Sequence, residues 1–237
     1  MDHIDLLEKG SLVLFVALFA AWELLRPARP NRTSIELFDV VAVVNVGLFS
    51  LACKVLLTPS ESYTLAPLGH LSLPAKIVAA LLIIDFCLYW MHRAMHSSVL
   101  WNTHRFHHSI TEINWLKGIY ASGTHISMYV APQILIGHYV FSFSRFEMAL
   151  TVAIGYFVQL WQHANITVNL GPLRFLFVTP QFHRMHHALG KEARDRNFGS
   201  VLSVWDWMFG TYAEPEREDY EVGIADKVPV VRGLLGI

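Results

Sequence analysis

The sequence predicts an all-α protein: a multi-pass bundle of transmembrane helices with a cytosolic helical cap that is rich in histidine. The chain of 237 residues is 54% hydrophobic and only 16% charged, which is more apolar than a water-soluble domain needs. Its apolar residues gather in stretches near the ~20 residues that cross the hydrocarbon core of a bilayer. Most of its histidines gather in short groups just beyond those stretches.

Five apolar stretches are expected to form the membrane spans. They are Ile4–Leu25, Phe38–Leu57, Ala75–Trp90, Ile126–Phe143 and Phe146–Gln162. The last two are joined by a tight turn at Ser144 and Arg145. Because no internal repeat or long linker separates them, we expect residues 1–237 to form one integral-membrane domain, with residues 91–125 and 163–237 as its cap.

The distribution of positive charge predicts how the spans are oriented. Arg26, Arg29 and Arg32 lie between the first two spans, whereas the connection Thr58–Pro74 contains no Lys or Arg. Because short cytoplasmic loops are enriched in Lys and Arg, the first connection is expected in the cytoplasm. An even number of crossings then separates the histidines after the third span from those after the fifth. All the histidine groups should therefore emerge at one membrane face.

Charge and cysteine content exclude several classes of function. The formal net charge is −1, which gives no global attraction for nucleic acid, and no recognition motif for it occurs. The two cysteines, Cys53 and Cys87, lie inside predicted spans. A disulfide framework and a cysteine-based zinc finger are therefore excluded.

Three histidine groups have the spacing of metal ligands, because helical residues three or four apart stand on one face. The groups are His92 with His96; His104 with His107 and His108; and His183 with His186 and His187. A zinc ion takes three or four protein ligands, so eight imidazoles indicate two ions. Nitrogen donors suit iron, zinc, copper or nickel better than magnesium or calcium.

The surroundings of these groups add further candidates. Asp85 and Tyr89 lie on the same helical stripe as His92 and His96, so they are expected to support the ligands from behind, with Asp85 accepting a hydrogen bond from an imidazole. A structural hydrogen bond from Asp85 to another helix is an equally weighted alternative. Pro180 is placed to begin a helix just before His183.

The segments DFCLYWMHRAMH, WNTHRFHHS and PQFHRMHH resemble the three histidine boxes of the sterol desaturase and fatty acid hydroxylase superfamily. Residues 197–212, NFGSVLSVWDWMFGTY, also resemble the C-terminal signature of that superfamily, and the similarity extends from Asp85 to Tyr212. The resemblance implies an integral-membrane enzyme in which two iron ions use dioxygen to hydroxylate or desaturate an unactivated C–H bond of a lipid. Zinc can substitute for iron in a purified form.

By this resemblance nine histidines are implied as metal ligands: His92, His96, His104, His107, His108, His163, His183, His186 and His187. His163 corresponds to an additional ligand that relatives carry between the second and third boxes. His125 is a possible ligand only, because relatives often have an Arg-x-His-Pro pattern where this chain has Gly123-Thr124-His125-Ile126. The metal site is expected on the cytoplasmic face, of the inner membrane in a bacterium or the endoplasmic reticulum in a eukaryote.

The resemblance leaves the lipid open among sterol, fatty acyl, sphingolipid, ether-lipid and carotenoid substrates. Three residues separate the histidines of the first box, where carotenoid hydroxylases usually have four. Ser97 follows that box, where alkylglycerol monooxygenases often have Glu, so both options are less favoured. Because no flavin or nicotinamide fingerprint and no cytochrome domain occurs, an external ferredoxin, rubredoxin or cytochrome is expected to supply electrons.

Two other classes of function were weighed. A membrane zinc hydrolase would use few histidine ligands with a nearby general-base carboxylate, typically in an HExxH motif, and no such motif occurs in the sequence. A non-catalytic metal carrier or haem protein would need imidazoles on facing spans within the bilayer, whereas nearly all of these lie just beyond the spans. A lipid hydroxylase or desaturase is therefore the favoured interpretation.

Overall fold

The computed structural model describes residues 3–30, 37–59, 66–190, 195–217, 219–226 and 228–237. Five long helices form the body of this part: α1 (His3–Leu25), α2 (Leu37–Leu57), α3 (Leu73–Met95), α5 (Gly123–Leu135) and α6 (Arg145–His163). Shorter helices gather at one end of the bundle: α4 (Trp101–His108), α7 (Pro180–His186), α8 (Val204–Met208) and α9 (Val230–Leu235). The described residues contain no strands beyond isolated bridges, so the expectation of a mostly helical protein is confirmed.

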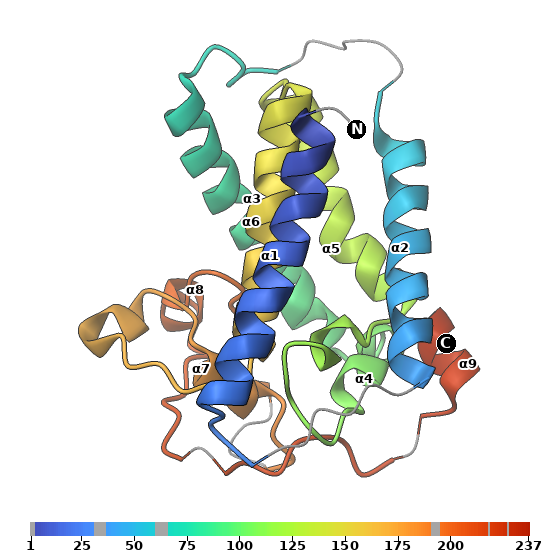
Figure 1. Cartoon of the computed structure of the whole chain (residues 1–237), viewed down its shortest axis with the longest axis vertical. Helices are drawn as coiled ribbons and strands as arrows, with labels where there is room; N and C mark the ends of the chain where they lie inside the picture. The colour runs from blue at the N-terminus through green and yellow to red at the C-terminus, as the bar shows by residue number, and fades with distance from the viewer. Residues whose placement is uncertain (1–2, 31–36, 60–65, 191–194, 218, 227) are drawn as a thin grey trace.

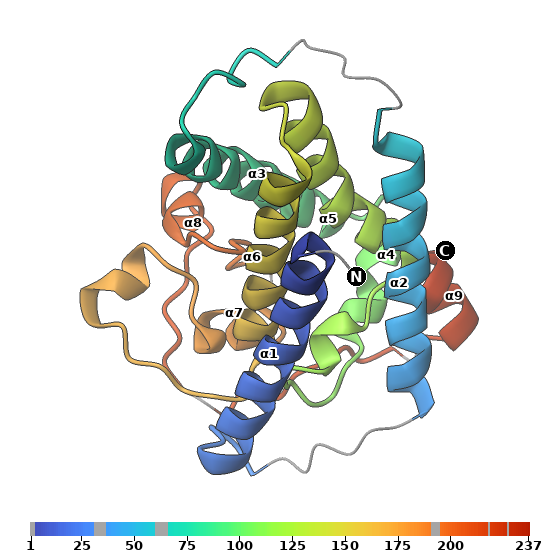
Figure 2. The same ribbon diagram turned by 45° about the horizontal axis from the view of Figure 1, so that its top comes forward.

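Pairs of long helices build the bundle. In Figure 1, α1 lies across α6 and α2 runs beside α5, and these two pairs have the most extensive contacts. In Figure 2, α8 lies beside α3, and Phe86 of α3 contacts Trp205 of α8 with ring centroids 5.1 Å apart. Phe19 of α1 is completely buried against Leu160 and Ile166, which fixes α1 to the end of α6. The short helices therefore sit on a scaffold of packed long ones.

Local sequence signals explain where the helices begin. Ser144 caps α6 in a capping box, because its hydroxyl accepts from the Glu147 N–H and the Glu147 carboxylate accepts from the Ser144 N–H. Thr179 caps α7 and Pro180 is its first residue, as the sequence predicts. The turn expected at Ser144 and Arg145 is thus confirmed as the start of α6.

The stretch Ile126–Phe143 is not one regular helix. The α-helical part begins earlier, at Gly123, and ends at Leu135, where a π-helical turn, η2 (Ile136–Val140), replaces it. Pro132 lies inside α5 and has no N–H to donate, which weakens the helix near its end. Because α5 begins at Gly123, His125 lies within its first turn and not in a separate cap.

Two of the described helices, α2 and α3, are long and apolar enough to cross a membrane. The other predicted spans coincide with α1, α5 with η2, and α6, which do not meet the same test of length and hydropathy. The outer face of α2 is strongly apolar and exposed, with Val43, Leu48 and Leu51 all more than half exposed. Such a surface is characteristic of a helix that faces lipid. Arg32 and residues 60–65 of the second connection lie outside the described residues.

Candidate metal centre

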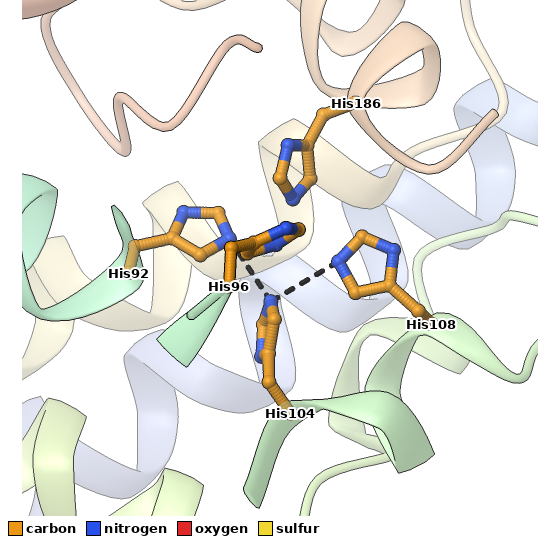
Figure 3. Close-up of side chains that lie close together, drawn as sticks. All are labelled: His92, His96, His104, His108 and His186. Carbon is orange, nitrogen blue, oxygen red and sulfur yellow. Dashed lines mark hydrogen bonds between the residues drawn. The ribbon is translucent and has the colours of Figure 1, made fainter. Parts of the chain in front are cut away.

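All nine histidines expected as ligands lie together at one end of the bundle, in two adjacent groups. The first group takes side chains from α3, α4 and α7, and one ring nitrogen from each side chain lies within 4.8 Å of those of all the others. Its members are His92, His96, His104, His108 and His186. Figure 3 shows their rings pointing toward one another around a common centre. The Nε2 atom of His104 lies 3.0 Å from Nε2 of His92 and 3.1 Å from Nε2 of His108.

The second group takes side chains from α4, α6 and α7, and its nitrogen atoms meet the same distance limit. Its members are His107, His163, His183 and His187. The Nε2 atom of His183 lies 3.0 Å from that of His163 and 3.2 Å from that of His187. His163, the additional candidate at the end of α6, thus stands in the same position toward its group as the box histidines do.

The two groups are in direct contact through their imidazole rings. The rings of His108 and His187 stack with their centroids 4.4 Å apart, and those of His186 and His183 stack with centroids 5.3 Å apart. Helices α4 and α7 each contribute to both groups, because each carries two adjacent histidines, His107–His108 and His186–His187, that point to different sides. The two adjacent histidines of each box therefore divide the nine expected ligands between two neighbouring groups.

Backbone carbonyl groups orient the imidazoles from behind. The Nδ1 atom of His92 lies 2.8 Å from the Phe198 carbonyl oxygen, and that of His186 lies 2.7 Å from the Arg196 carbonyl oxygen. In the second group Nδ1 of His107 and of His163 meets the carbonyl oxygens of Tyr120 and Gln159, each at 2.9 Å. Since only an N–H can donate to a carbonyl, these contacts assign the proton to Nδ1 and direct the Nε2 lone pair into the group.

Asn197 shapes the segment that supplies two of these carbonyl groups. Its backbone has φ of 61°, in the left-handed region that asparagine tolerates better than most residues. Its side-chain amide is completely buried, donates to the Ala213 carbonyl at 3.0 Å and accepts from the Ala213 N–H at 2.7 Å. The carbonyl groups on either side of this residue, those of Arg196 and Phe198, can therefore reach two different histidines of the first group.

Asp85 and Tyr89 bond to the segment that follows the third histidine box, and not to the imidazoles as the sequence suggests. The Asp85 carboxylate accepts hydrogen bonds from the backbone N–H groups of Val201 and Leu202 and from Trp205 Nε1, at 2.8–3.0 Å. The Tyr89 hydroxyl bonds to Thr211 at 2.9 Å. Among the described residues, neither group hydrogen-bonds to an imidazole. The second reading of Asp85, a structural hydrogen bond to another element, agrees with these contacts.

His125 belongs to neither group. Its Nδ1 atom lies 3.2 Å from Nδ1 of His104, and its ring lies against Tyr129 with centroids 4.9 Å apart. This position is the one that an orienting partner of His104 would take, on the side of the ring that faces away from the first group.

Burial keeps the imidazoles outside the long helices neutral. For His104, His107, His108, His183, His186 and His187 burial lowers the pKa well below its usual range, and neighbouring imidazoles lower it further. Neutral imidazole is the form that binds a metal ion. The groups are therefore in their ligating state at physiological pH.

The donor set fits two transition-metal ions. Two nitrogens that each lie about 2.1 Å from one ion, at right angles, are about 3.0 Å apart, which is close to the observed 3.0–3.2 Å. Nε2 of His186 and of His96 is buried without a hydrogen-bond partner among the described residues. Buried donors without partners are costly unless something binds them. Nitrogen-only donors select iron, zinc, copper or nickel.

Two charged side chains hold the end of α1 and α7 against the site; sequence reasoning missed the first, Glu23, and expected charged hydrogen bonds from the second, Arg184. The Glu23 carboxylate accepts from the N–H groups of Trp115 and Asn165 at 2.8 and 2.7 Å. The completely buried Arg184 donates to the Ile166 carbonyl at 3.0 Å. An acidic residue at the end of an apolar helix was the available signal for Glu23, since such a residue rarely lies there without a partner.

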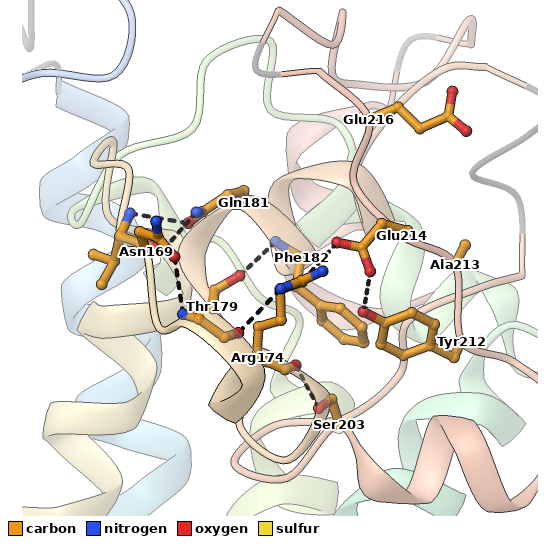
Figure 4. A network of polar contacts seen from close by, with 12 residues as sticks. Asn169, Arg174, Thr179, Gln181, Phe182, Ser203, Tyr212, Ala213, Glu214 and Glu216 are labelled. Carbon is orange, nitrogen blue, oxygen red and sulfur yellow. Dashed lines mark hydrogen bonds and ion pairs between the residues drawn. The ribbon is translucent and has the colours of Figure 1, made fainter.

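A polar network on the outer side joins the segment before the third box to the C-terminal segment (Figure 4). Arg174 Nε lies 3.0 Å from the Glu214 carboxylate, which also accepts from the Tyr212 hydroxyl at 2.6 Å. Ser203 donates to the Arg174 carbonyl at 3.1 Å. This network holds the C-terminal signature residues in contact with the region that leads into α7.

Comparison with known proteins agrees with the histidine pattern. Residues 77–211 match the family model described as fatty acid hydroxylase. The chain is 28% identical to human alkylglycerol monooxygenase over 232 residues, which cover 91% of this chain and 48% of that protein. It is 31% identical over 163 residues to the ornithine lipid hydroxylase of Rhizobium tropici, covering 65% of this chain and 46% of that protein.

The alkylglycerol monooxygenase of Danio rerio is 32% identical over 154 residues, covering 63% of this chain and 33% of that protein. The chain thus spans about half or less of the length of these curated relatives. No solved structure matches. Because the family model covers the histidine groups and more than half of the chain, the protein belongs to the fatty acid hydroxylase family, within the sterol desaturase and fatty acid hydroxylase superfamily.

Proposed function

We propose that this protein is a dioxygen-dependent lipid monooxygenase that holds two iron ions, one in each histidine group. The observation that carries this proposal is the division of nine imidazoles, eight of them buried, into two adjacent groups with nitrogens at metal-ligand spacing. The nine histidines act as ligands, and His125 orients His104. Two iron ions bound there would supply the redox chemistry that activates dioxygen for attack on a C–H bond.

The residues of the chain hold and orient the ligands and exclude water. The carbonyl groups of Phe198, Arg196, Tyr120 and Gln159 keep each bonded imidazole in the Nδ1–H tautomer. The burial of every histidine in the second group keeps bulk water from the centre, which protects a reactive oxidant from side reactions. Electrons are supplied by an external ferredoxin, rubredoxin or cytochrome.

The proposed setting is a multi-pass membrane domain, with the metal centre at the cytoplasmic face. The exposed apolar faces of α1, α2 and α3 support several crossings. Arg29, in the connection that the charge rule assigns to the cytoplasm, donates to the Tyr220 carbonyl at 2.7 Å, so this connection lies at the same end as the histidine groups. All of residues 1–237 contribute to one domain in this proposal.

The proposed substrate is a membrane lipid that carries a polar headgroup. Two of the relatives are named for action on alkylglycerol and on ornithine lipid. Because this chain is similar to these relatives, ether lipids are again candidates, although Ser97 alone makes them less favoured. Addition of one oxygen is favoured over desaturation because the relatives are named as monooxygenases and hydroxylases.

The test is turnover with isotopically labelled dioxygen. Protein purified from iron-supplemented cells is incubated with a chemical reductant, a redox mediator and an extract of the host membrane lipids, and the products are analysed by mass spectrometry. We expect one labelled oxygen in a lipid product, no product without dioxygen, and no product from a folded His107→Ala variant. Conversion that continues without dioxygen would instead indicate a hydrolase, and a strong Soret absorption band would indicate haem.

A further inference from the structure

A long cavity runs inside the bundle between α1, α2, α3, α5 and α6. Its volume is about 460 Å³, within the range of sites that bury a small-molecule ligand. Its lining follows α6 from Arg145 to Gln162, a distance of about 25 Å at the helical rise of 1.5 Å per residue. The shape suits one extended chain better than a compact ring system.

The cavity can be reached from the side. Helix α1 packs on α6 and α2 packs on α5, and in both views α1 and α2 stand apart with α5 between them (Figures 1 and 2). Both helices line the cavity, α1 through Glu8 and α2 through Val46, Ser50 and Lys54. Since the outer faces of α1 and α2 are apolar and exposed, a lipid can enter between them from the bilayer.

One end of the cavity lies at the metal centre. His125, the partner of His104, lines it there together with Tyr129 and Ser200. Ser200 is 3% exposed, and its hydroxyl lies near that of Tyr129 but makes no hydrogen bond of ordinary geometry with the described residues. Beside Tyr129 the Ser200 hydroxyl keeps hydrogen-bonding capacity that a ligand oxygen could use.

Gly155 lies part-way along the cavity. A Cβ atom at this position would lie 3.6 Å from both side-chain polar atoms of Gln133, which lines the opposite helix, α5. The space is therefore sufficient for a methyl group, whereas a larger side chain would enter the cavity. Gly155 is seven residues before Gln162, or about 10 Å along α6.

We propose that this cavity binds the lipid substrate lengthwise. An oxygen next to the reacting carbon bonds to Ser200, and a single long hydrocarbon chain passes Gly155 toward the Arg145 end. The identity of this ligand as a substrate rests on the proposed function, but its binding requires neither metal nor dioxygen. Gly155 is then the residue that determines how long a chain the site accepts.

The test uses two monoalkylglycerol ethers, with octyl and octadecyl chains that each end in a photoactivatable diazirine. Wild-type protein in detergent should be labelled by the octadecyl probe on peptides near Arg145. Gly155→Leu should reduce that labelling about tenfold, as expected when a side chain fills occupied space, and leave octyl labelling within about twofold. Ser200→Ala should weaken labelling by both probes about fivefold, the effect of one lost hydrogen bond.

Gly47→Leu is the matched control, because Gly47 lies in α2 with nothing within 4 Å of its added Cβ. It should label as the wild type does. If Gly155→Leu does not fold, the smaller Gly155→Val, whose side chain still exceeds a methyl group, should reduce octadecyl labelling about twofold. Unchanged octadecyl labelling in the Gly155 variants, or an equal loss in Gly47→Leu, would overturn the proposal. Because labelling needs no turnover, an inactive protein that binds both probes as expected would refute only the proposed function.

Discussion

Asn197 offers a specific test of how the first histidine group is held. Replacement by Ala removes three hydrogen bonds of its side-chain amide, two with Ala213 and one to the Phe182 carbonyl at 3.3 Å. Each contributes about 0.5–1.5 kcal/mol, and holding Ala at a positive φ costs about 1 kcal/mol more. The sum is a loss of about 4 kcal/mol in the free energy of unfolding.

The expected effect on metal binding is local. Without Asn197 the carbonyl groups of Arg196 and Phe198 no longer hold His186 and His92, and loss of such a partner lowers metal affinity about 10- to 100-fold. The second group takes its partners from Tyr120 and Gln159, which the substitution does not touch. Asn197→Ala should therefore lose one of two ions at a chelator concentration at which the wild type keeps both.

The assay combines thermal unfolding in detergent with metal analysis across a chelator titration. About 4 kcal/mol corresponds to a fall in the melting temperature of about 8–16 °C for a chain of this size. Asn197→Gly should recover about 1 kcal/mol, because glycine accepts a positive φ without strain. Asn102→Ala, an exposed asparagine of α4, is the control and should change neither quantity. An unchanged melting temperature with both ions retained in Asn197→Ala would refute this reasoning.

Two further substitutions test the supports of the site. Asp85→Asn should lower the free energy of unfolding by about 2–4 kcal/mol, measured by thermal unfolding, since an amide cannot accept from all three donors that the carboxylate binds. Substitution of the exposed Asp219 by Asn is the control. Equal effects of the two substitutions would contradict the prediction. Glu23→Ala should cost about 2–5 kcal/mol because it leaves two backbone N–H groups unpaired, whereas Glu23→Gln, which keeps an acceptor oxygen, should cost about 1 kcal/mol or less. Equal loss in both Glu23 variants would show that charge, and not hydrogen bonding, is the important property.

The sequence was sufficient to predict the helical class, the start of α7 at Pro180 and the histidines that meet in the two groups. These features depend on local signals, namely apolar stretches, helix caps and the spacing of like residues. The stretch Ile126–Phe143 was predicted less well, because apolar composition does not distinguish a regular helix from one that ends in the π-helical turn of η2.

The supports of the histidines could not be predicted from residue types. The atoms that accept from His92 and His186 are backbone carbonyl oxygens, which every residue has, and they are placed by the left-handed conformation at Asn197. Asp85 similarly binds N–H groups more than a hundred residues further along the chain. Such contacts depend on the completed tertiary structure and leave no periodic pattern in the sequence.

The central claim is that each histidine group holds one metal ion, and metal analysis tests it most directly. Protein from iron-supplemented cells should contain two metal ions per chain. His92→Ala, in the first group, and His163→Ala, in the second, should each retain about one ion while remaining folded. One ion in the wild-type protein, or loss of both ions in each variant, would contradict the account of two separate sites.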